Sequence, residues 1–152
     1  KNENFSGSIL LHTSSGEKFI NREQILKGKD IIDSYKVFIS KSYGERGEYP
    51  FLFLGKPFAG APGEVCTQTY LSIGPLSDKS EVDSVISYMK TKFFRFLVGM
   101  KKNTQDAMRG VYSFVPVLDW NTQYTDQELY EKYKGKAKFP PELRLLFTLG
   151  GF

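Results

Sequence analysis

The feature that most constrains the fold is an apolar stripe between residues 80 and 100. Large apolar side chains recur there at the spacing of one helical face: Val82, Val85, Ile86, Met89, Phe93, Phe96, Leu97 and Met100. Ser80 with Asp83 three residues later predicts the N-terminal cap, and Gly99 predicts the end. Such a stripe needs an apolar partner surface, so we expect one main amphipathic helix over residues 82–99, packed on a sheet.

Four segments have the β-branched and aromatic content of strands, and they begin near Lys36, Phe51, Val65 and Val111. The third, over residues 65–73, alternates, and its more polar face carries Cys66, Gln68, Tyr70 and Ser72. We therefore expect the α+β fold class: a twisted, mostly antiparallel sheet with the main helix on one face and a C-terminal helix.

One compact domain is expected from a chain of 152 residues. Residues 1–34 mix a short apolar run with Ser, Gly and Asn, so we expect a loosely structured opening segment with one short helix over residues 21–27, capped by Asn21. Thr125 and Glu128 have the spacing of a capping box and predict the C-terminal helix. The body of the domain then spans residues 35–134, and residues 135–152 form a divergent or truncated tail.

The positive charge of the chain is concentrated in one segment. The formal net charge is +4. Residues 90–109 carry a single acid, Asp106, and six basic side chains: Lys90, Lys92, Arg95, Lys101, Lys102 and Arg109. Such a patch is typical of a surface that meets phosphates, and it is also typical of a solvated helix end. Charge alone leaves both interpretations open.

The sequence contains no recognisable catalytic or metal-binding motif. Cys66 and His12 are the only residues of their types, which excludes a disulfide and a zinc site of the usual kind. We expect Cys66 to be a small core or sheet-face residue and His12 to lie at the surface. No apolar run approaches the roughly 20 residues that span a bilayer. We therefore expect a cytoplasmic chain with no membrane contact, no enzymatic activity, no metal and no cofactor of its own.

Two loops combine the side chains that contact DNA phosphates and base edges. Residues 40–49 offer glycines, Tyr and Arg, and residues 101–106 offer Lys, Asn and Gln. Both loops are equally typical of solvated turns. With the basic helix and the polar strand face, they give these candidate DNA-binding residues: Lys41, Tyr43, Arg46, Gln68, Lys90, Arg95, Lys101, Lys102, Asn103, Gln105 and Arg109.

A family resemblance covers about residues 36–133. The pieces CTQTYL, YMKTKFFRFLV, NTQDA, YSFVPVLDW and DQELYEKY, in this order, resemble the C-terminal specificity region of bacterial restriction-modification proteins of the adenine-specific DNA methyltransferase type. The tail KGKAKFPPELRLLFTLGGF departs from that pattern. The N/D-P-P-Y/F tetrad of a catalytic domain is missing, because Phe139 and Glu142 are the wrong flanks for the paired prolines.

The resemblance implies a DNA target-recognition domain that binds double-stranded DNA beside a catalytic domain of the same polypeptide. The parent would be an N6-adenine DNA methyltransferase, a type II restriction enzyme or a combination of both, and S-adenosylmethionine would bind the parent outside this chain. A different interpretation remains open, in which the chain is a protein-interaction module that docks a catalytic subunit.

Overall fold

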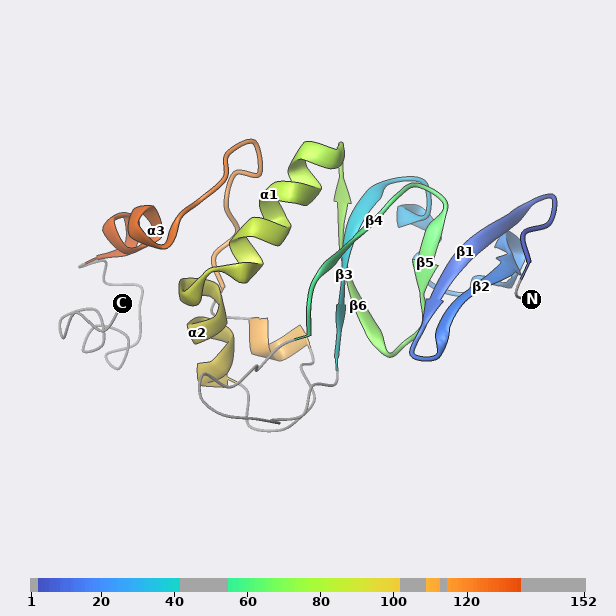
Figure 1. The fold of residues 1–152 in the computed structure, drawn as a ribbon, viewed down its shortest axis with the longest axis horizontal. Helices are drawn as coiled ribbons and strands as arrows, with labels where there is room; N and C mark the ends of the chain where they lie inside the picture. Colours follow the sequence, from blue (N-terminus) through green and yellow to red (C-terminus); the bar gives the residue numbers. More distant parts are fainter. Residues whose placement is uncertain (1–2, 42–54, 102–108, 113–114, 135–152) are drawn as a thin grey trace.

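The computed structural model describes residues 3–41, 55–101, 109–112 and 115–134. Within them, two small sheets lie side by side, and the α-helices lie on the far side of the second sheet (Figure 1). The first sheet has the strand order β2-β1-β5, from Gly16–Asn21, Ser8–Thr13 and Glu64–Cys66. The second has the order β4-β3-β6, from Phe58–Gly60, Tyr35–Ser40 and Tyr70–Leu76. The α+β class is confirmed, with the strands divided between two sheets where we expected one.

All strand pairs in the two sheets are antiparallel except the pair of β1 with β5. The sheets meet through aromatic rings. The His12 ring of β1 lies 5.3 Å from the Phe38 ring of β3 and 5.2 Å from the Phe58 ring of β4, between centroids. Tyr70 at the start of β6 extends this cluster, with its ring 5.7 Å from that of Phe58. The aromatic cluster therefore holds the first sheet against the second.

The opening segment is more ordered than we expected. β1 and β2 form a hairpin in which Thr13 pairs with Gly16, so only two residues make the loop. Gly16 adopts a φ of 116°, which an L side chain rarely adopts. The short helix expected over residues 21–27 is reduced to a single 3₁₀ turn, η1 (Arg22–Gln24), with Asn21 at its N-cap as predicted, and η2 (Lys29–Ile31) follows.

The nine-residue strand expected over residues 65–73 is also wrong, because the chain turns between Thr67 and Tyr70. The Tyr70 N–H donates to the Thr67 carbonyl over 3.1 Å, as in a β-turn. The residues before the turn form β5 in the first sheet, and those after it form β6 in the second. The segment near Phe51 lies outside the described residues. The segment near Val111 contains a 3₁₀ helix, η3 (Arg109–Tyr112), so the strand expected from Val111 is wrong there.

The main helix is divided in two, α1 (Lys79–Lys90) and α2 (Lys92–Lys101), at Thr91. The Thr91 hydroxyl donates to the Tyr88 carbonyl over 2.6 Å and accepts from the Phe94 N–H over 3.1 Å. One side chain thus ends α1 and caps α2. The predicted cap at Ser80 is wrong, because Asp78 caps α1 by accepting from the Glu81 N–H over 2.9 Å. The predicted end at Gly99 is two residues early.

The apolar stripe is buried as expected, although it lies on two helices. Val82, Val85, Met89, Phe93 and Leu97 belong to one core with Val37 and Ile39 of β3. The C-terminal helix α3 (Asp126–Tyr133) adds Leu129 to that core, and its predicted capping box of Thr125 and Glu128 is present. Asp126 also joins α3 to α2, since its carboxylate accepts from the Lys92 and Phe93 N–H groups over 3.2 and 2.9 Å.

Candidate nucleic-acid interface

Two of the predicted DNA-binding residues lie at one corner of the molecule. Lys41 directly follows β3, and Gln68 lies in the turn that precedes β6. The strands are adjacent and antiparallel, with Ser40 paired to Tyr70, so the end of β3 meets the start of β6. The Lys41 N–H donates to the Thr69 carbonyl over 3.0 Å and ties the two segments together. Residues 27 positions apart in the sequence thus share one corner.

The basic helical residues extend toward the same end of the molecule. α2 ends and η3 begins at the lower side of Figure 1, where β3 also ends and β6 begins. Lys101 is the last residue of α2 and Arg109 the first of η3, and the two elements contact each other. Their backbones therefore bring two predicted basic positions to this end. Lys90 lies farther from it, exposed in the last turn of α1.

Arg95 differs from the other basic candidates because it is half-buried in α2. Its Nε atom is buried and has no hydrogen-bond partner among the described residues. Burial of this atom favours a role in supporting the helix, with only part of the guanidinium left to meet a ligand. Five other predicted site residues lie outside the described residues: Tyr43, Arg46, Lys102, Asn103 and Gln105.

His12 is not the surface residue that we expected. Its side chain is 12% exposed, and its Nε2 atom lies 3.0 Å from a Glu64 carboxylate oxygen. Its Nδ1 atom lies 3.6 Å from Glu17 on β2. The imidazole thus links three strands of the first sheet while its face contacts the aromatic cluster. This environment suits a structural residue, because both ring nitrogens already face carboxylates.

Lys36 is the buried charged residue that the sequence did not reveal. It is 1% exposed, and its ammonium donates to the carbonyls of Ile32, Ala61 and Glu64 over 2.9, 3.2 and 2.8 Å. Burial lowers the pKa of this ammonium, and the nearby Glu64 carboxylate opposes that shift. All three donors of the ammonium are used, so the side chain joins β3 to β5 and is not free to bind a phosphate.

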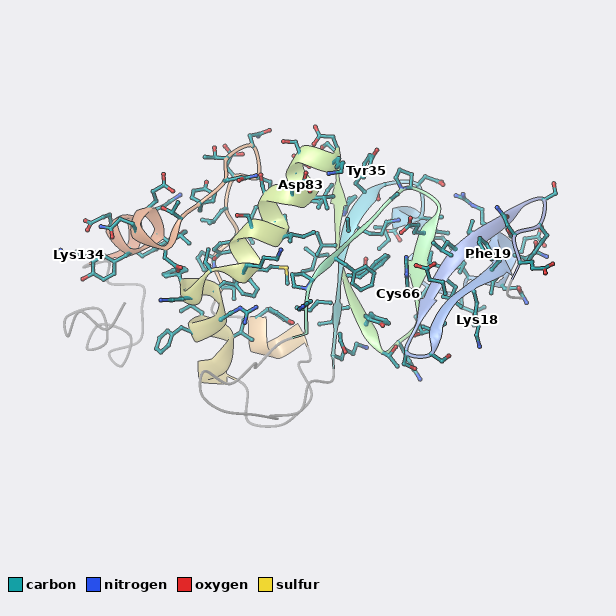
Figure 2. The ribbon with its side chains drawn as sticks, viewed as in Figure 1. Lys18, Phe19, Tyr35, Cys66, Asp83 and Lys134 are labelled. Carbon is teal, nitrogen blue, oxygen red and sulfur yellow. The ribbon has the colours of Figure 1, made fainter. Side chains whose placement is uncertain are left out.

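Cys66 lies half-buried on β5, beside the second sheet (Figure 2). Burial raises the pKa of its thiol, and the charges of Lys41 and Lys36 offset part of that rise. A thiol with a raised pKa is a poor nucleophile at neutral pH. The described residues contain no group of three or more His, Cys, Asp or Glu side chains placed to hold a metal ion.

An apolar cavity of about 320 Å³ lies between β6, α1, α2, η3 and the segment after η3. Its walls include Ile73, Met89, Phe94 and Trp120, and the Tyr88 hydroxyl at its side donates to the Pro116 carbonyl over 3.2 Å. Val117 at the cavity is 86% exposed. The lining contains no charged side chain, so this cavity suits an apolar partner and not a phosphate.

Comparisons with known proteins return no relative: no family model, no curated protein and no solved structure matches this chain. Among the described residues, no helix is long and apolar enough to cross a membrane.

Proposed function

We propose that this chain is a double-stranded DNA-binding domain that contributes target recognition to a bacterial restriction-modification protein. The observation that carries the proposal is the position of separate elements at one end of the molecule. The end of β3 with Lys41 adjoins the turn with Gln68, and the end of α2 and the contacting η3 lie on the same lower side of Figure 1. Basic side chains neutralise phosphates and amides pair with base edges, so this end has both kinds of group that DNA recognition needs.

The helical residues supply the long-range part of the interaction. Lys90, Lys101 and Arg109 add positive charge along the α1–α2–η3 side. Neutralising phosphates releases condensed counterions from the duplex, which gives binding without sequence preference and a steep dependence on salt. Sequence preference must then come from the few side chains that reach base edges.

The family resemblance assigns the chemistry to the rest of the parent protein. In this proposal the parent is an adenine-specific DNA methyltransferase, alone or combined with an endonuclease, and acts in the cytoplasm. Its catalytic domain binds S-adenosylmethionine and extrudes the target base, because an amino group inside the base stack is inaccessible. This chain holds the duplex in register for that domain and carries out no reaction itself.

A salt titration with matched variants tests the proposal. Fluorescence anisotropy of a labelled duplex should give a linear fall of log affinity with log salt concentration. The double variant Lys41→Ala, Lys101→Ala should lower the slope by about two, since each lost phosphate contact removes roughly one unit. Lys79→Ala is the control, because Lys79 opens α1 at the opposite end of the second sheet and pairs with Asp83.

The control distinguishes an effect of the proposed surface on the salt slope from an effect of the total charge. Lys79→Ala changes the net charge as a single Lys41→Ala does, but it should leave the slope unchanged. Equal slopes for the wild type and the double variant would mean that this end of the molecule does not contact DNA. Absence of salt-dependent binding by the wild type would refute DNA binding altogether.

The apolar cavity favours a second function, in which the chain docks a catalytic domain or subunit. Aromatic residues and Met are enriched at interface cores, and Met89, Trp120 and the exposed Val117 meet at this cavity. Val117→Asp should then weaken binding of the catalytic domain at least tenfold in calorimetry while DNA affinity stays within about twofold. Unchanged binding of the catalytic domain would exclude the cavity as that interface.

A further inference from the structure

The turn formed by residues 67–70 (the 67–70 turn) is held at its two ends by different sheets. On one side the Thr67 N–H donates to the His12 carbonyl of β1 over 3.0 Å. On the other side the Thr69 carbonyl accepts from the Lys41 N–H over 3.0 Å. The Tyr70 N–H closes the turn itself. Three backbone hydrogen bonds thus hold this turn, which contains neither glycine nor proline.

The side chains of the 67–70 turn are also arranged in a defined way. The hydroxyls of Thr67 and Thr69 lie 2.7 Å apart and share one hydrogen bond across the turn. Two hydroxyls carry two protons, and only one of these is used between them, so among the described residues the other proton has no acceptor. Gln68 lies between them, exposed, and its amide makes no hydrogen bond to any described residue. The turn therefore presents an amide flanked by two threonine hydroxyls, and the backbone of Lys41 is bonded to the same turn.

We propose that the 67–70 turn is the base-reading element of this domain, with Gln68 pairing to an adenine in the major groove. Lys41 and the second threonine O–H anchor the adjacent phosphate. This inference rests on the proposed function and specifies which residue carries sequence information and for which base. In it, Gln68 determines the sequence specificity, and Lys41 and the threonine hydroxyl position the duplex.

Adenine is favoured by the pattern of donors and acceptors. The glutamine amide has one N–H₂ donor and one carbonyl acceptor, which match the N7 acceptor and N6 donor of adenine. Guanine presents two acceptors, N7 and O6, in the same groove, so one of them would lie against the amide oxygen, which is also an acceptor. The backbone of the turn is already held by three hydrogen bonds, so pairing has to order only the Gln68 side chain and costs less conformational entropy than ordering a loose loop.

Selection from a randomised duplex library tests the inference, because the library contains every short target sequence and none has to be chosen in advance. The full chain is incubated with the library, and the bound duplexes are sequenced for wild type, Gln68→Ala, Gln68→Glu and Lys41→Ala. Gln127→Ala is the matched control, because Gln127 is an exposed glutamine on α3, distant from the turn. Thermal unfolding of each variant checks that the turn variants remain folded.

The expected result is a wild-type preference for adenine at one position or more, of roughly 5- to 150-fold over other bases. Gln68→Ala should lose that preference at one position and retain the salt slope. Gln68→Glu should favour cytosine there, because a carboxylate only accepts and the cytosine amine donates. Lys41→Ala should weaken binding to all duplexes and leave the base preferences intact.

Other outcomes overturn the inference in distinguishable ways. If the wild type binds duplexes in a salt-dependent manner but enriches no base, or if Gln68→Glu behaves as Gln127→Ala does, the inference fails and DNA binding stands. If Gln68→Ala weakens all duplexes equally, Gln68 is a phosphate contact and the assigned role is wrong. If the wild type binds no duplex, the proposed function fails and the inference fails with it.

Discussion

Replacing Lys36 by methionine should lower the free energy of unfolding by about 2–4 kcal/mol. Methionine keeps the apolar stem in place and removes the ammonium, whose three bonds join β3 to the carbonyls of Ile32, Ala61 and Glu64. Hydrogen bonds from a charged donor contribute roughly 1.5–3 kcal/mol each, and desolvation of the ammonium offsets several kcal/mol of the total. Two of the carbonyls also accept a backbone N–H, from Gly63 and Glu64, so neither is left without a partner.

Chemical denaturation monitored by the single tryptophan, Trp120, measures this loss directly. Lys18→Met on β2 is the control, since Lys18 is an exposed strand lysine (Figure 2), and it should stay within about 0.5 kcal/mol of wild type. Equal stabilities of Lys36→Met and wild type would mean that burial of the charge cancels all three bonds. Lys36 would then not stabilise the contact between β3 and β5.

The same variant makes a prediction about pH. Burial lowers the pKa of the Lys36 ammonium from its ordinary value of 10.5, so the unfolded chain holds this proton more tightly. The contribution of Lys36 to stability therefore rises as the pH increases through the folded-state pKa toward 10.5. That rising component should be present in wild type and absent from Lys36→Met, in unfolding curves recorded across alkaline pH.

Three further predictions concern single side chains. Thr91→Val should cost about 1–2 kcal/mol in urea unfolding, because it removes the hydroxyl that serves both helices, whereas Thr91→Ser should cost clearly less. Gly60→Ala should cost about 1–3 kcal/mol, since a Cβ there would clash with the Phe38 ring and lie 2.9 Å from Lys36 Cγ; Gly110→Ala, which meets open space, should be tolerated. Burial raises the pKa of Tyr112 to about 12, so the unfolded chain loses this proton first and the free energy of unfolding should fall above about pH 10. Tyr112→Phe should reduce that fall in unfolding curves recorded across alkaline pH. An unchanged pH profile of stability in Tyr112→Phe would contradict this prediction.

The parts of the fold that the sequence predicted correctly depend on local spacing. The capping box of Thr125 and Glu128 involves residues three apart, and the apolar stripe involves positions three and four apart. Neither needs information from distant parts of the chain. The sequence does not predict the division of the stripe at Thr91, because threonine is not a helix breaker. The carboxylate that accepts from the Lys92 N–H at the start of α2 belongs to Asp126, 34 residues farther along the chain.

The parts that the sequence did not predict depend on tertiary contacts. As a lone histidine, His12 is expected at the surface, and the sequence does not reveal its contact with Glu64 because the two residues are 52 positions apart. The turn at Gln68 lacks the glycine or proline that usually signals one, and it forms because each flank pairs with a different sheet. For the candidate site, residue types could be chosen from the sequence, but the meeting of Lys41 with Gln68 required the register of β3 with β6.

The parallel pairing of β1 with β5 has a consequence for the order of folding. The hairpin of β1 and β2 closes over a two-residue loop and can form within microseconds. The third strand of the first sheet, β5, begins at Glu64, and pairing Leu10 with Glu64 closes a loop of about 54 residues. The hairpin should therefore form early, and the first sheet should be completed late, after β3, β4 and the ring of Phe58 provide a surface against which it docks.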